Sequence, residues 1–137
     1  MASAPRTHAI MAYMTEADVI AHWRKGARDA LEMAQLALQA GKYDHALFNC
    51  QLAVEKALKA KIMEKTRKPH PKIHDLRKLS LLVHDSWTVE ENELFDIVSY
   101  FAVAARYDDP LWAQQYATAE HATKWIERSI TFCSHPS

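Results

Sequence analysis

Glycine and proline are scarce in this chain, which has 2 glycines and 5 prolines among 137 residues. These two residues form the tight turns that join short strands, and both are unfavourable inside helices. Alanine, the strongest helix former, occurs 22 times. The composition therefore argues against an all-β protein and predicts an all-α fold, with a length suited to one domain.

Cysteine is equally rare, and the histidines show no metal-binding spacing. Cys50 and Cys133 are the only cysteines, far apart in sequence and without metal-binding spacing, so a disulfide framework and a cysteine-based zinc site have no support. His70 and His74 are separated by Pro71, so they cannot occupy one face of a regular helix as two metal ligands. We therefore expect no metal and no cofactor.

Neither net charge nor a long apolar run is present. The 17 basic residues balance 17 acidic ones, which argues against a protein that coats DNA or lies on a membrane surface. No stretch approaches eighteen uncharged apolar residues, and the N-terminus lacks the apolar segment of a signal peptide. We expect a cytoplasmic protein with no membrane contact, a flexible tail over residues 1–14 and a helical domain over residues 15–133.

Apolar residues recur every three or four positions and divide the chain into helices. Thr15 is expected to cap the first helix, Gly41 to end it, and Asp44 to cap the second. Asp75 begins a short third helix, and Thr88 with Glu91 has the spacing of a capping box. The sequence thus predicts an antiparallel bundle of about five helices, four long and one short.

The last helix is predicted to run without interruption from Asp109, which precedes Pro110 and is suited to cap it. Its inward positions, read at spacings of three and four, are Trp112, Tyr116, Ala119, Thr123, Ile126 and Ile130.

A basic run extends from Glu55 to Lys78, with nine basic residues against three acidic ones. Lys56 and Lys59 share a helix face there and are candidates to attract phosphate. Two simpler interpretations remain open. Cations stabilise a helix C-terminus without any ligand, and Glu55 precedes Lys59 by four residues, which favours an intrahelical ion pair.

The strongest candidate site is the junction that holds Arg106, Tyr107 and Asp108. Arginine can bind phosphate through two hydrogen bonds, a phenol ring can stack on a base, and a carboxylate can orient the arginine. His74 is a further candidate because an adjacent acid can orient its imidazole. The alternatives are a capped, salt-bridged corner at the junction and a local hydrogen bond at His74.

Four segments carry a resemblance to a known family. They are Gly41 to Ala46 (GKYDHA), Ala53 to Ala60 (AVEKALKA), His74 to Leu76 (HDL) and Ala105 to Tyr107 (ARY). In this order they resemble the HEPN domain, the nucleotide-binding domain of higher eukaryotes and prokaryotes, over about residues 17–129. The resemblance implies a helical bundle that often dimerises and, in many bacterial and archaeal cases, a gene partner of the minimal nucleotidyltransferase class, as in toxin–antitoxin pairs.

Many members of that family are ribonucleases whose motif is an arginine, four to six further residues, and a histidine after the fourth helix. Arg106 matches the arginine, but the positions for the histidine hold Leu111, Trp112 and Ala113. The resemblance therefore implies a non-catalytic module that binds a nucleotide or RNA weakly. The proposed binding residues are Arg106, Tyr107, Asp108, Lys56, Lys59 and His74.

Two alternatives to this module remain. One is a toxin-like ribonuclease in which His74 replaces the missing histidine, and the other is an oligomerisation adaptor without a ligand. We also expect a homodimer, because Phe95, Phe101, Trp112 and Tyr116 supply more apolar surface than one small bundle hides.

Overall fold

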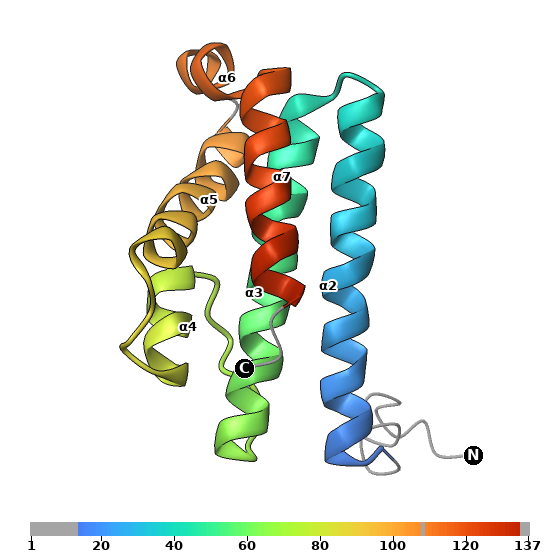
Figure 1. Cartoon of the computed structure of the whole chain (residues 1–137), viewed down its shortest axis with the longest axis vertical. Coiled ribbons are helices and arrows are strands. Elements are labelled where there is room, and N and C mark those ends of the chain that lie inside the picture. Colours follow the sequence, from blue (N-terminus) through green and yellow to red (C-terminus); the bar gives the residue numbers. More distant parts are fainter. Residues whose placement is uncertain (1–13, 108, 135–137) are drawn as a thin grey trace, which may run out of the picture.

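The computed structural model describes residues 14–107 and 109–134, which form six helices and no strand (Figure 1). The helices are α2 (Glu16–Gln39), α3 (Tyr43–Thr66), α4 (Leu76–Val83), α5 (Val89–Tyr107), α6 (Pro110–Tyr116) and α7 (Ala119–Ser134). The all-α bundle is confirmed. The described residues contain one helix more than the five expected.

Most of the predicted helix starts are confirmed. Capping interactions join residues that are close in sequence, so the sequence alone is sufficient to predict them. The hydroxyl of Thr15 accepts from the Asp18 backbone N–H, while the Asp18 carboxylate accepts from the backbone N–H of Thr15. Gly41 has the positive φ of 73° that ends α2. Asp44 is the exception: α3 begins at Tyr43, its N-cap Lys42 offers no side-chain bond, and Asp44 lies inside the first turn.

The starts of α4, α5 and α6 also follow the prediction. Asp75 accepts a hydrogen bond from the Lys78 backbone N–H, and Asp109 accepts one from Leu111. Thr88 and Glu91 exchange the two bonds of a capping box at the start of α5.

The predicted last helix is wrong in one respect, since it is divided into α6 and α7. Ala117 has φ −81° and ψ 64°, and Thr118 N–H donates to the Tyr116 carbonyl at 2.8 Å, which is an inverse γ-turn. The Thr118 hydroxyl then accepts from the His121 backbone N–H and starts a new helix. The break changes the register, so Ala119 and Thr123 are exposed instead of buried.

Helix α3 lies at the centre of the bundle and contacts α2, α4, α5 and α7. Residues on all of its faces are consequently buried, including four polar ones, Gln51, Glu55, Lys59 and Lys61. A helix surrounded in this way cannot keep its charged side chains in water, and each of them needs a partner within the fold.

Helices α5, α6 and α7 complete the core with aromatic side chains. Phe101 packs against Trp112, Tyr116 and Trp125, while Phe95 contacts other aromatic rings at the opposite end of α5. No helix in the described ranges is long and apolar enough to cross a membrane.

Candidate functional site

A buried carboxylate organises the most polar part of the bundle. Glu55, on the central helix α3, accepts hydrogen bonds from Gln51 Nε2 at 2.8 Å and from Lys59 Nζ at 3.0 Å. The Nδ1 atom of His74 lies 3.1 and 3.2 Å from the two carboxylate oxygens. The side chains of Glu55 and Lys59 are 8% and 4% exposed, whereas that of His74 is 78% exposed.

These contacts set the protonation state of Glu55 and the tautomer of His74. Burial raises the pKa of Glu55, but the hydrogen bonds from Lys59, Gln51 and His74 together outweigh it, so the pKa lies below its ordinary value. The ionised carboxylate only accepts hydrogen bonds, and Nδ1 of His74 therefore carries the hydrogen. The outer nitrogen, Nε2, is left available to a ligand in solvent.

The two candidate lysines have different surroundings. Lys59 is in the intrahelical ion pair with Glu55 that the spacing favours, and its ammonium lies 5.7 Å from the centre of the Trp23 ring. Lys56 is half-buried beside Gly26 of α2, where an added Cβ would lie 3.0 Å from Lys56 Cδ. Lys56 is thus the lysine with more access to solvent, and Lys59 acts within the buried cluster.

Arg106 is exposed in the last turn of α5. No other residue in the described ranges forms an ion pair or hydrogen bond with it. Seven residues earlier, Ser99 Oγ accepts from the backbone N–H of Leu76 at 3.3 Å, which places the start of α4 against this side of α5. Residues seven apart share a helix side and lie about 10 Å apart along the axis, so Arg106 and His74 border the same side of α5.

Tyr107 belongs to a different face. Consecutive residues on a helix are separated by about 100°, and Tyr107 lies with Tyr100 and Val103 on the outward side of α5. Tyr107 is 76% exposed. The structure therefore does not bring Arg106 and Tyr107 to one point, and Asp108 lies outside the described residues.

The positions that would hold the catalytic histidine offer no substitute. Leu111 is exposed and Trp112 is buried against Phe101, and neither side chain exchanges protons as imidazole does. His74 borders the same side of α5 as Arg106. Within the described ranges, no group of three or more His, Cys, Asp or Glu residues could hold a metal ion.

Gln51 and Trp23 also belong to the polar cluster, although neither was predicted as a site residue. Gln51 could have been found, because it precedes Glu55 by the same four residues that separate Glu55 from Lys59. Trp23 lies on another helix and meets Lys59 only through the packing of α2 on α3, so local spacing gives no signal for it.

Comparisons with known proteins agree with the fold. The model of the HEPN domain family matches residues 20–135, which is most of the chain. A crystal structure of TT1696 from Thermus thermophilus superposes with a TM-score of 0.70 at 24% identity, covering 84% of this chain and 93% of that one. A search of curated proteins finds no match.

Proposed function

This chain belongs to the HEPN domain family, and on that premise we propose that it is a non-catalytic module that binds a nucleotide or RNA. The observation that carries the proposal is the surface beside α5. An arginine without a partner in the described ranges borders the same side of that helix as His74, whose imidazole is oriented by a buried carboxylate.

The chemistry of these groups suits phosphate. The guanidinium of Arg106 can donate two parallel hydrogen bonds to phosphate oxygens, and it needs to break no ion pair with a described residue to do so. His74 borders the same side of α5, whereas Lys56 packs against Gly26 of α2 on another face of α3 and enters the proposal only as a more distant positive charge. Tyr107 can stack on a base that extends around the helix, since every base offers a ring face. Asp108 remains part of the proposal as an orienting carboxylate.

A pair of matched variants tests this site. Arg106→Ala should weaken the binding of ATP or of a short oligoribonucleotide roughly ten- to hundred-fold, because one charge-assisted contact contributes about 1.5 to 3 kcal/mol. Arg28→Ala removes an exposed arginine from α2 and should leave the affinity unchanged. Calorimetric titration measures both, with thermal melting as the control for folding. Equal affinities in the two variants would contradict the proposal.

Dimerisation is part of the same proposal, although three of the four aromatic residues expected to supply its surface are buried, and only Tyr116 is partly exposed. Phe95, Phe101 and Trp112 are at most 3% exposed within one protomer and supply no surface. The outward side of α5 and the start of α6 instead carry exposed apolar side chains, namely Tyr100, Val103 and Leu111. Such side chains are typical of a surface that a second protein covers.

Light scattering tests this surface. The chain should have twice the 15.7 kDa mass of one protomer at tens of micromolar. Val103→Glu should produce monomers, whereas Leu36→Glu, at an exposed position of α2, should leave the dimer intact. A monomer in the unmodified chain would refute the dimer. A minimal nucleotidyltransferase as further partner rests on the family alone, and co-purification with an adjacent gene product tests it.

A ribonuclease is the second candidate, and the geometry of His74 favours it over an adaptor. An imidazole whose Nδ1 is hydrogen-bonded to a carboxylate and whose Nε2 is accessible, as in His74, can act as a general acid or base. The absent histidine after Arg106 favours the non-catalytic module. Labelled single-stranded RNA separates the two functions: cleavage that disappears in both Arg106→Ala and His74→Gln, with contaminating nucleases inhibited, would replace the module with the ribonuclease.

A further inference from the structure

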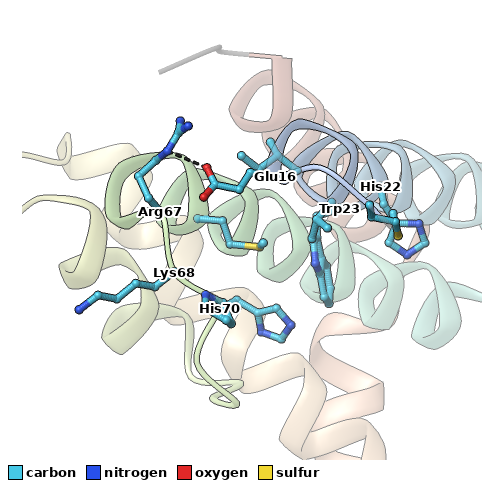
Figure 2. Close-up of a pocket in the computed structure, with 11 residues that line it drawn as sticks. Glu16, His22, Trp23, Arg67, Lys68 and His70 are labelled. Atoms are coloured by element: carbon cyan, nitrogen blue, oxygen red, sulfur yellow. Dashed lines mark ion pairs between the residues drawn. The ribbon is translucent and has the colours of Figure 1, made fainter. Parts of the chain in front are cut away.

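A cavity of about 590 Å³ opens where the start of α2 meets the end of α3, and the segment after Thr66 forms its remaining wall (Figure 2). It contains neither Arg106 nor His74, so it is distinct from the surface beside α5. A cavity of this volume is within the range that holds small organic ligands. Its wall residues are Met14, Glu16, Val19, Ile20, His22, Trp23, Met63, Arg67, Lys68, Pro69 and His70.

The inside of the cavity is apolar and aromatic. Val19, Ile20 and Met63 belong to a small hydrophobic cluster separate from the main core, and Trp23 packs on its edge. The rings of Trp23 and His70 meet edge to face with centroids 4.4 Å apart, which gives the cavity a rigid aromatic wall. A ligand that fills this space must present an apolar body.

The mouth, in contrast, carries charge. Arg67 forms an ion pair with Glu16 at 2.8 Å that joins the end of α3 to the start of α2, and both side chains are more than half exposed (Figure 2). Lys68 follows Arg67, and its side chain extends away from the rings of Trp23 and His70 (Figure 2). Two positive charges and one negative charge leave a net charge of +1 at the mouth when the histidines are neutral.

Arg67 also has an unusual backbone conformation. Its φ of 58° is the only positive value at a non-glycine residue in the described ranges. Glycine is the usual residue where a helix ends in this left-handed conformation, because a side chain adds steric cost there. An arginine at this position keeps a guanidinium at the mouth that glycine would not supply.

We propose that this cavity is a binding site for an amphipathic monocarboxylate, a molecule with one carboxylate and an aliphatic or aromatic body. The body fills the space between Met63 and the Trp23 ring. The carboxylate takes the place of Glu16 as partner of Arg67, in a charge-assisted hydrogen bond. One negative charge matches the net charge of the mouth, whereas AMP carries about two and has a polar sugar that the apolar interior cannot satisfy.

Nuclear magnetic resonance of the Trp23 indole N–H tests the site, with octanoate as the probe and octan-1-ol as its uncharged match. The chain has four tryptophans, and a Trp23→Phe variant identifies the signal. Octanoate should shift this signal in a saturable manner and bind more tightly than octan-1-ol. AMP should leave the signal unchanged.

Three variants separate charge from folding. Arg67→Gly should weaken octanoate binding about fivefold, as expected for an exposed ion pair, while the protein remains stable because glycine favours the positive φ. Glu16→Gln should strengthen octanoate binding by a similar factor, since it removes the carboxylate that competes for Arg67. Arg28→Ala, outside the cavity, should leave the affinity unchanged.

Three results would overturn the proposal. The first is the absence of a saturable shift at Trp23 with octanoate. The second is equal affinity for octanoate and octan-1-ol, or no effect of Arg67→Gly, since either means that the charged mouth does not take part. The third is an AMP-induced shift at Trp23 that competes with octanoate, which would make the cavity a nucleotide site.

Discussion

The carboxylate of Glu55 should be the most costly charged group to remove from this bundle, and Glu55→Leu tests that expectation. The substitution leaves the Lys59 ammonium inside the bundle, with a side chain 4% exposed, and deprives Gln51 and His74 of their acceptor. Removing one partner of an exposed ion pair costs much less stability, because water solvates the remaining charge.

The magnitude follows from burial. Breaking a buried ion pair by removing one partner costs about 3 to 5 kcal/mol, mostly as the cost of an uncompensated charge. For a chain of 137 residues, the entropy of unfolding is about 0.29 kcal/mol per kelvin near 60 °C. Glu55→Leu should therefore lower the Tm by about 10 to 17 °C.

Calorimetry and urea unfolding measure the loss of stability in Glu55→Leu. Two further variants show whether the loss comes from the unpaired charge of Lys59. Glu55→Leu combined with Lys59→Met removes the stranded charge and should recover more than about 1 kcal/mol of the loss. Glu93→Ala breaks an exposed pair with Arg128, whose side chain is 35% exposed, and should cost less than about 1 kcal/mol.

Two results would refute this prediction: a cost of Glu55→Leu no larger than that of Glu93→Ala, or no recovery of stability when Lys59→Met is added. Either result would mean that Lys59 reaches water in the folded protein and that the cluster is not a buried network.

Three further predictions concern other parts of the bundle. Thr118→Ala removes the hydroxyl that caps α7 and should cost about 1 kcal/mol in urea unfolding, whereas Thr123→Ala, at an exposed position inside the helix, should cost much less. The pKa of Glu55 is lower in the folded protein than in the unfolded chain. The contribution of Glu55 to stability is therefore present above its unfolded-state pKa and disappears as the pH falls through its folded-state pKa. Glu55→Gln should show a weaker loss of stability in acid, measured as the free energy of unfolding between pH 7 and pH 3. Burial raises the pKa of both Cys50 and Cys133 to about 12. Iodoacetamide at pH 8, with mass spectrometry as the readout, should therefore label neither thiol in the native protein and both in urea. Labelling of the native protein would contradict this prediction.

The sequence was sufficient for features that depend on neighbouring residues. The caps at Thr15, Asp75 and Asp109 follow from one side chain and the backbone three or fewer residues away, and all three are confirmed. The family resemblance, read from four short segments, is confirmed as well. The division at Thr118 was missed because an apolar period of three to four residues continues through it, although threonine is itself a capping residue.

The candidate site was less predictable, since it depends on which faces of α3 are covered. The sequence shows Lys56 and Lys59 as neighbours on one helix, and packing alone decides that Lys59 is buried while Lys56 remains partly accessible. The relation of His74 to Arg106 also depends on packing, because it is set by the contact of Leu76 with Ser99. The roles proposed for Arg106, Tyr107, Asp108, Lys56, Lys59 and His74 stay predictions.

One short segment, from Arg67 to Asp75, borders both proposed sites. It supplies Arg67 and His70 to the cavity, and four residues after His70 it supplies the imidazole that Glu55 orients. The two affinities are therefore coupled whenever binding at one site moves this segment. Thermodynamic linkage makes such coupling reciprocal: a carboxylate that strengthens phosphate binding tenfold must itself be bound tenfold more tightly in the presence of phosphate.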